Sequence, residues 1–586
     1  MAKSRGAVYV AKVKRRYKNK VYVYYLLRRA YREGGKVKQK TLANLSALPQ
    51  QTIELIRGSL RGERYLPEQQ VVQKRRTWLH GHVAAVGAML RALGLDALIA
   101  PQPSAERELV VAMIVARVVA AHTKLATTRW WANTSLVEQP TVASADEDDL
   151  YEAMDWLLDR QPDIERALAA RHLHEGGMVL YDLSSSYVEG RHCPLAARGH
   201  NRDGKKGKLQ VNYGLLLEDA GRPVAVQVYR GNTADPRTVA DQLHKIKHRF
   251  RLGHVVLVGD RGMLTSARIR QIRTQDGIDW ISALRSKEIQ KLADAGAVPL
   301  SLFDERDLAE IASPEFPGER LVVCRNPLLA EDRARTRSEL LAATEVLLQK
   351  LAQRVASGRL KRADKIAAAL GRVKNRYKVG KHFICEVAEA HFAFRRDQDR
   401  IAREAALDGI YVVRTSVPET ALSAEGVVYG YKSLALAEQA FKTLKSIDIR
   451  VRPIHHRLAR RVRAHILLCM LAYYVEWHLR HAWAPYLFED EQPGRHEDDS
   501  PVRPAVRSEA ALQKAARKQT PDGQTVHTFA TLLELLSTIT RDEMIIPARP
   551  EVPPFFLTTT PDRLQQELLH RAGAEAAPAR RQKSPA

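Results

Sequence analysis

Residues 177–190, GMVLYDLSSSYVEG, and residues 254–262, HVVLVGDRG, decide the fold of this chain. In each stretch a short, β-branched apolar run leads directly into an aspartate, Asp182 in the first and Asp260 in the second. Short apolar runs that are closed by Ser or Gly are typical of buried strands rather than of helices. We therefore predict two buried strands, each of which leads into a carboxylate.

The segments that follow Asp182 complete one predicted domain. Strands are expected at 209–217, 223–229 and 279–284, and helices at 239–250 and near 265–274. Pro236 suits a first helical turn, where its missing N–H is not needed. The order β-β-β-α-β-α-β resembles that of a ribonuclease-H-like fold, whose first and fourth strands are neighbours. We therefore expect Asp182 and Asp260 to converge on one point.

Two carboxylates at neighbouring strand ends indicate a particular chemistry. Carboxylate oxygens are the ligands that hard divalent cations prefer, and such cations hold phosphate oxygens in return. The alternative is that both aspartates are surface residues in turns. For Asp182 this alternative is the weaker one, because Asp182 continues a buried strand pattern and an unpaired buried carboxylate is costly.

Length and composition limit the architecture and the kind of partner. A chain of 586 residues is too long for one hydrophobic core, so several domains are expected. The net charge of +26 favours a polyanionic partner. The cysteines have no paired spacing, which argues against disulfides and zinc and fits a reducing, cytoplasmic location. The N-terminus shows no signal sequence, and the longest apolar run, 464–475, is too short to span a membrane, so no membrane association is expected.

Residues 1–50 are expected to form a basic β-meander that contacts DNA. Strand-like segments cover 8–13, 20–27 and 36–42, and residues 1–40 hold 14 Lys and Arg with a single acid, Glu33. Tyrosines are interleaved with these basic residues, and basic strands with aromatic side chains suit phosphate contact and base stacking. The alternative is a solvated sheet edge that is kept basic to prevent aggregation.

The rest of the chain is expected to divide into six regions. A helical DNA-binding or linking domain covers 51–176, with helices at 107–121 and 149–173. A catalytic core covers 177–285 and 409–485, and an inserted α+β subdomain at 286–408 separates its two parts. A linker covers 486–527, and a helical region with a disordered tail covers 528–586. Within the insertion we expect a strand at 320–324, helices at 335–355 and 360–373, and strands at 383–387 and 391–395.

Two segments carry candidate phosphate-binding residues. The loop 198–208, RGHNRDGKKGK, contains Lys205 and Lys206 and is either a DNA-backbone clamp or a solvated hairpin loop. In the segment 431–446, YKSLALAEQAFKTLKS, helical spacing aligns five residues on one face: Tyr431, Leu434, Glu438, Lys442 and Lys445. A glutamate flanked by lysines suits a metal ligand with phosphate-holding neighbours, although taken alone the segment is an ordinary solvated helix face.

The ordered set of motifs resembles a bacterial insertion-sequence transposase of the DDE type, in the branch whose ribonuclease-H-like core is interrupted before its glutamate. That branch carries a signature of Tyr, two residues, Arg, three residues, Glu, six residues and Lys. Here it reads Tyr431, Leu434, Glu438 and Lys445, so Leu434 replaces the arginine. Further matches are the Gly-Asp-Arg-Gly at 259–262, the Arg-Pro-Ile-His-His at 452–456, and the start of the chain at 31–36 and 41–45.

The resemblance implies an activity and a site. Asp182, Asp260 and Glu438 would bind two Mg²⁺ ions, with Mn²⁺ as a substitute, for phosphoryl transfer on DNA. Tyr431, Lys442 and Lys445 would hold phosphates beside the cut. The enzyme would bind the inverted repeats of its element, cleave both ends and join the 3′-hydroxyls to target double-stranded DNA, as a homodimer in a synaptic complex. Leu434 lacks the guanidinium that grips phosphate, and the insertion has no Trp, so a hairpin intermediate is only a hypothesis.

Several alternatives stay open. A ribonuclease-H-like nuclease would cut without joining strands, and a catalytically inactive, transposase-derived protein would only bind DNA. Ser184–Ser186 is a weaker nucleophile candidate, because no hydrolase-like motif accompanies it. Asp203, Asp235 and Glu189 are alternative metal ligands, of which Asp235 has a better role as the cap of the helix that starts at Pro236.

Overall fold

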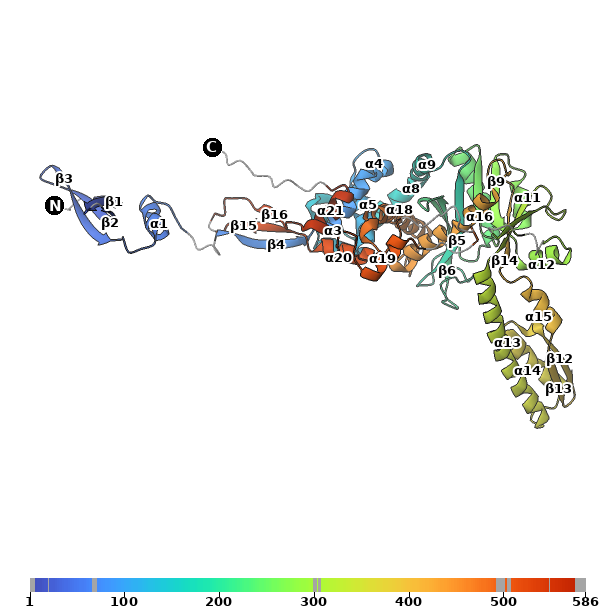
Figure 1. The fold of residues 1–586 in the computed structure, drawn as a ribbon. Helices are drawn as coiled ribbons and strands as arrows, with labels where there is room; N and C mark the ends of the chain where they lie inside the picture. Colours follow the sequence, from blue (N-terminus) through green and yellow to red (C-terminus); the bar gives the residue numbers. More distant parts are fainter. Residues whose placement is uncertain are drawn as a thin grey trace. The chain divides into compact units, whose positions relative to one another are not determined.

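The computed structural model describes residues 6–18, 20–65, 71–298, 303, 307–491, 501–502, 507–547 and 549–574 (Figure 1). The described residues form two compact units. One lies within residues 1–78 and 540–559, and the other within residues 79–539 and 560–586. The predicted boundaries at residues 50 and 527 do not coincide with this division. The predicted disordered tail from residue 575 onward lies outside the described residues.

The first unit contains two three-stranded sheets, each described here by itself. The predicted meander is confirmed, with longer strands: β1 (Val8–Tyr17), β2 (Lys20–Glu33) and β3 (Lys36–Asn44) pair antiparallel in that order. Helix α1 (Gln50–Leu60) packs against β1 and buries Ile53. The second sheet has the order β16-β15-β4 and joins β4 (Gln73–Leu79) to β15 (Thr540–Ile545) and β16 (Phe555–Thr558). Sequence patterns do not predict β4, because Trp78 is its single buried residue.

A large mixed sheet forms the centre of the second unit. Its order is β10-β11-β14-β9-β8-β5-β6-β7. The five strands that the sequence predicted are β5 (Met178–Tyr187), β6 (Gln210–Glu218), β7 (Pro223–Arg230), β8 (Val255–Gly259) and β9 (Ile278–Ala283). The expected neighbouring of the first and fourth strands is confirmed, since β5 and β8 pair in parallel and Tyr181 lies opposite Gly259. The residue that follows each of these two is an aspartate, Asp182 within β5 and Asp260 directly after β8. The pairing therefore brings the two aspartates close together in space.

Residues 286–408 differ in part from the predicted separate subdomain. Strands β10 (Leu308–Ile311) and β11 (Arg320–Arg325) join the large sheet through β14 (Ile410–Thr415), all antiparallel. What stands apart is a helical pair, α13 (Pro327–Ala356) and α14 (Ala363–Arg376), with the hairpin β12 (Phe383–Ala388) and β13 (His391–Arg396) and helix α15 (Gln398–Ala405), as predicted in type (Figure 1). It has its own apolar core, built around Leu348, Ile366 and Phe383.

Helices that precede the strands of the large sheet in the sequence share one hydrophobic core with a helix that follows them. α5 (Ala105–Val119) and α8 (Glu147–Asp159) pack on each other and on α18 (Ala459–Trp483), which also contacts β7. The predicted helix 149–173 is divided at Arg160 into α8 and α9 (Gln161–His172), because Pro162 at the start of α9 cannot continue the preceding helix. Among the described helices none alone is long and apolar enough to cross a membrane; the bent pair α5 and α6 (Lys124–Trp131) passes that test by length and composition only.

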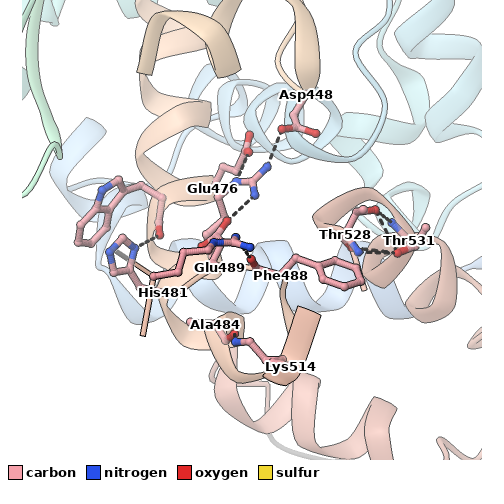
Figure 2. A network of polar contacts seen from close by, with 12 residues as sticks. Asp448, Glu476, His481, Ala484, Phe488, Glu489, Lys514, Thr528 and Thr531 are labelled. Carbon is pink, nitrogen blue, oxygen red and sulfur yellow. Dashed lines mark hydrogen bonds and ion pairs between the residues drawn. The ribbon is translucent and has the colours of Figure 1, made fainter. Parts of the chain in front are cut away.

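A charged network ties the end of α18 to the segment that follows the predicted glutamate helix (Figure 2). The Arg480 guanidinium donates to Glu476 at 2.7 Å, to Glu489 at 2.8 Å and to Asp448 at 2.7 Å. Asp448 comes directly after the π-helical turn η4 (Thr443–Ile447). Because Glu476 is fully buried on α18, this network fixes the chain that leaves the glutamate helix against the core.

Part of the predicted linker is folded. Residues 509–517 form α19 (Glu509–Arg517), and its Lys514 ammonium donates to the Ala484 carbonyl at 3.1 Å and to Glu491 at 3.0 Å (Figure 2). The predicted C-terminal helices are present as α20 (Phe529–Ser537) and α21 (Arg563–Arg571). A segment whose lysine is buried against the end of α18 is packed structure, so composition alone misled the linker prediction here.

Candidate active site

The three predicted carboxylates line one cavity of about 420 Å³. Asp182 comes from β5, Asp260 directly follows β8, and Glu438 lies on α17 (Leu434–Lys442), which packs against β5. The other lining residues are Asn326, Tyr411, Tyr431, Lys432, Leu434, Ala435 and Val502. Residues that lie more than 250 positions apart along the chain therefore meet at the end of two parallel strands.

The Asp182 carboxyl has a raised pKa. Burial, with smaller contributions from the neighbouring Asp260 and Glu438 carboxylates, raises this pKa to about 6, against the lowering effects of the Leu183 N–H and of Arg202. The Leu183 N–H donates to Asp182 Oδ1 at 2.8 Å. Neighbouring carboxylates repel each other when they are ionised, and a cation placed among them stabilises the ionised forms. The electrostatics of the cavity therefore suit a positively charged ligand.

The donor chemistry of the cavity fits hard divalent cations, but the side chains do not form a ready-made metal cage. Three carboxylates and the amide of Asn326 offer oxygen donors, which Mg²⁺ and Mn²⁺ prefer. Over the described ranges no three His, Cys, Asp or Glu side chains lie close enough together to hold one ion. Asp260 is exposed, and its Oδ2 accepts the Gly262 N–H at 3.2 Å, so its carboxylate has room to turn. Strands β5 and β8 and a helix place the three carboxylates near each other, and the binding of a cation would draw their oxygens together.

The predicted helix at 431–446 is interrupted twice, and this corrects the expectation of a single face. Tyr431 lies in the last turn of α16 (Ala424–Lys432), and the helix resumes as α17 after Ser433. At the break the Ser433 hydroxyl donates to the Gly430 carbonyl at 2.7 Å, and the Leu436 N–H donates to the Ser433 carbonyl at 2.9 Å. Tyr431 and Glu438 nevertheless line the same cavity.

Tyr431 keeps its proton in this environment. Burial, together with the Asp260 and Glu438 carboxylates and against the effect of Arg261, raises the pKa of its hydroxyl to about 12. A protonated phenol at the cavity wall can donate a hydrogen bond to a phosphate oxygen. Its placement suits the predicted phosphate contact.

Lys445 does not lie on the helix face of Glu438, where the spacing predicts it. It belongs to the π-helical turn η4, in which each hydrogen bond spans one residue more than in an α-helix, so the side chains beyond Lys442 are rotated away from the Glu438 face. The Lys445 ammonium is buried and donates to Asp203 Oδ1 at 3.1 Å, beside an ion pair between Arg452 and the same carboxylate. A phosphate contact by Lys445 would have to compete with this pair. Lys442 is exposed on α17.

The loop 198–208 is organised around its own polar contacts. Asn201 Oδ1 accepts the N–H groups of Asp203 and Lys205, and the Lys205 and Lys206 side chains are exposed to solvent. Arg202 pairs with Asp235 at 2.5 Å. Asp203 and Arg202 hold the loop in place, and phosphate binding by the exposed lysines stays a prediction.

The alternative ligands and nucleophiles are engaged in other contacts. Asp203 binds Lys445 and Arg452, and Glu189 binds Lys208 at 3.0 Å. Asp235 does not cap its helix, which corrects that expectation: it is the first residue of α10 (Asp235–His244), and its carboxylate pairs with Arg202 instead. Among the predicted serines, Ser186 is buried in β5 with its hydroxyl 3.0 Å from the Tyr213 hydroxyl.

Sequence reasoning did not single out five lining residues. Lys432 and Ala435 lie within the predicted segment 431–446, and Asn326, Tyr411 and Val502 lie outside the predicted site segments. Asn326 had a readable signal, because an Asn before Pro327 is typical of a helix start, and its side chain does cap α13 by accepting the Leu329 N–H. The Asn-Pro pattern indicates only that Asn326 caps a helix, and it does not indicate that Asn326 also lines the cavity. Tyr411 sits in an apolar strand pattern and Val502 in a polar segment, so neither pattern indicates a site.

The comparisons with known proteins agree with this arrangement. The family described as "Transposase DDE domain" matches residues 180–475, just over half of the chain, and the family "IS1634 family transposase, N-terminal domain" matches residues 10–71. The protein belongs to the DDE-domain transposases. More particularly, its N-terminal match places it among insertion-sequence transposases.

Several solved chains match, and one of them illustrates how distant the similarity is. It is described as "Cryo-EM structure of piggyBac transposase synaptic complex with hairpin DNA (SNHP)", with 8% sequence identity and a TM-score of 0.34, over 78% of this chain and 76% of that one. A similarity this small carries no argument about residues or substrates. No curated protein matches the chain.

Proposed function

We propose that this protein is an active transposase that binds the inverted repeats of its insertion sequence, cleaves the element ends by metal-dependent phosphodiester hydrolysis, and joins the 3′-hydroxyls to target DNA. The observation that carries the proposal is the single cavity lined by Asp182, Asp260 and Glu438. Membership of the DDE-domain transposases and the net charge of +26 support the same substrate.

The catalytic core is proposed to be ribonuclease-H-like. Strands β7, β6, β5, β8 and β9 lie side by side, so the sheet reads 3-2-1-4-5 in order of appearance, with β6 antiparallel to its neighbours and β8 parallel to β5. This strand order supports the proposal. The helical pair and hairpin between β11 and β14 are proposed as the subdomain inserted before the glutamate.

Asp182, Asp260 and Glu438 would hold two Mg²⁺ ions, or Mn²⁺ in their place. When bound, these ions would supply activation of a water or 3′-hydroxyl and stabilisation of the leaving oxygen in an in-line displacement. The chain itself positions the acids: β5 and β8 hold the aspartates in parallel register, and α17 carries the glutamate to them. Tyr431 would donate to an oxygen of the scissile phosphate, and its high pKa keeps that donor available at neutral pH.

The N-terminal meander is proposed to contact duplex DNA. Lys12, Lys14 and Arg16 alternate along β1 and therefore share one face of the sheet. Lys12 pairs with Tyr25 of β2, and its ammonium lies 5.8 Å from the centroid of the tyrosine ring. Exposed cations beside aromatic rings suit a phosphate backbone. A homodimer is proposed because two element ends must be joined to one target.

The decisive experiment uses purified protein and a labelled duplex that carries the terminal repeat from beside its gene, with and without Mg²⁺. We expect metal-dependent nicking and joined product, both lost in Asp182→Ala, Asp260→Ala and Glu438→Ala while DNA binding persists. Nicking without joined product would establish the nuclease alternative instead. Binding without nicking by the wild-type protein would establish an inactive DNA-binding protein.

Product analysis in the same assay addresses the two remaining parts of the proposal. Cleavage that survives Glu438→Ala would exclude that glutamate as the third ligand. Hairpin-ended product would show that the cut passes through a hairpin although Leu434 stands at the arginine position; its absence with active protein would remove the hairpin.

A further inference from the structure

The carboxylate cavity continues into two further cavities. A space of about 820 Å³ shares Tyr411 and Tyr431 with it, and a third space of about 250 Å³ shares Arg261 and Ala283 with the second. One wall is built by the end of β9 and by α12 (Ser286–Asp294), and the other by α13 and the turn after α14. We name the second and third cavities together the side groove.

Most charges that line the deep part of the side groove are already neutralised. Arg337 pairs with Asp408, and Lys381 and His382 pair with Glu404. Arg333 is directed at the backbone carbonyls of Leu407 and Ile410. These contacts hold the inserted helices against the sheet and leave no net attraction for a ligand.

Three cations that line the second cavity differ from those pairs. Arg261 follows the catalytic aspartate of β8, Lys287 lies at the start of α12, and Lys378 lies in the turn after α14. Their side chains are exposed, and none of these side chains makes a hydrogen bond or ion pair with any residue that the structure describes. The core supplies the cations of one wall and the inserted subdomain supplies Lys378 on the other, so a polyanion between the walls would meet positive charge on both sides.

Two tyrosines line the junction with the carboxylate cavity. The Tyr411 hydroxyl is buried beside the Cys324 thiol, so Tyr411 offers its ring to the groove. The Tyr431 hydroxyl lies on the same junction. Aromatic rings that alternate with cations are the usual surface for one strand of nucleic acid.

We propose that the side groove binds a single-stranded DNA segment that continues from the phosphate at the carboxylates, with Arg261, Lys287 and Lys378 each holding one backbone phosphate. This inference rests on the proposed function and assigns the strand's path within it. The second cavity alone, at about 820 Å³, has the volume of a ligand pocket, about 300–1,000 Å³, which admits a few nucleotides of one strand and excludes a duplex. The strand would therefore leave its complement at the cut site.

The test is equilibrium binding of the full-length protein in EDTA, so that no cleavage intervenes. The probes are a short fluorescein-labelled single strand of mixed sequence and the duplex formed from the same strand. For the variant Arg261→Gln/Lys287→Gln/Lys378→Gln we expect the slope of log K against log salt for the single strand to fall by about 2, since three lost contacts contribute about 0.7 each. Duplex binding should keep its wild-type slope.

A matched control removes the same charge outside the groove. Arg270→Gln/Lys350→Gln/Lys365→Gln changes three exposed cations, one on the core and two on the inserted helices, none of which lines the cavities. We expect it to leave the single-strand slope near the wild-type value. Equal losses in the two triple variants, or no loss in the groove variant, would overturn the proposal. Because the assay needs neither metal nor cleavage, a protein that binds the strand in the groove but does not cut DNA would refute the proposed function alone.

Discussion

Replacing Asp182 by Asn is expected to stabilise the metal-free protein while it removes DNA cleavage. The pKa of Asp182 is raised from 3.8 to about 6 by burial and by two neighbouring carboxylates. At about 1.36 kcal/mol per pH unit, the ionised carboxylate costs the folded state up to about 3 kcal/mol. Asn keeps an oxygen that can accept the Leu183 N–H, so the substitution removes the charge and little else.

The sign of the pH dependence follows from the direction of this shift. Because the folded pKa lies above the unfolded value, the folded protein retains the proton longer, and stability falls as the pH rises from about 4 to about 6. The gain from Asp182→Asn should be small at the acidic end of that window and complete above about pH 6. Urea unfolding in EDTA, followed by tryptophan fluorescence at several pH values, measures it.

Two comparisons make this prediction refutable. Asp260→Asn is the matched control, because the Asp260 side chain is exposed, and it should stabilise the protein much less. Added Mg²⁺ should stabilise the wild type more than Asp182→Asn, since it binds where the charges lie. If the variant is no more stable than the wild type above pH 6, or is stabilised equally by Mg²⁺, the ionised Asp182 carboxylate does not destabilise the folded state as described.

Three further outcomes follow from the site and its surroundings. Asp203→Asn should lower the free energy of unfolding by about 3–5 kcal/mol, because it leaves the buried Lys445 without its anion; urea titration measures this, and an unchanged midpoint would contradict it. Tyr431→Phe should slow single-turnover cleavage by roughly tenfold to a hundredfold, the effect of losing a hydrogen bond of about 1.5–3 kcal/mol to a charged group, without a change in melting temperature. Glu165→Gln should destabilise the protein by about 3–5 kcal/mol, since its fully buried carboxylate binds Lys245 at 2.9 Å, and adding Lys245→Met should recover part of the loss.

The sheet and its aspartates could be predicted because their signal is local. β5 and β8 are buried on both faces, so they appear as unbroken apolar runs, and each run leads into an aspartate that lines the cavity. The order of elements then implies which strands are neighbours. Glu438 was accessible only through the spacing of its helix and the resemblance to a family, because a glutamate on an amphipathic helix is otherwise unremarkable.

The remaining parts depend on contacts between distant segments, which periodicity cannot show. Helical spacing from Tyr431 to Lys445 assumes an unbroken α-helix, and the break at Ser433 and the π turn at Thr443 each change the register of the residues beyond them. Lys445 consequently turns toward Asp203, a partner 242 positions away. Tyr411 and the described Val502 reach the cavity from segments whose own patterns indicate a strand and a linker.

The sheet β16-β15-β4 joins strands from opposite ends of the chain. During translation, Leu79 at the end of β4 leaves the ribosome long before Thr558 at the end of β16. At about 5–20 residues per second, the 479 residues between them take roughly 25–95 s to synthesise. For most of that time β4 lacks its neighbour β15, which ends at Ile545, and a polypeptide that is released before β15 never obtains one. This sheet can therefore form within one molecule only after almost the whole chain has been made, and nascent or truncated products lack it.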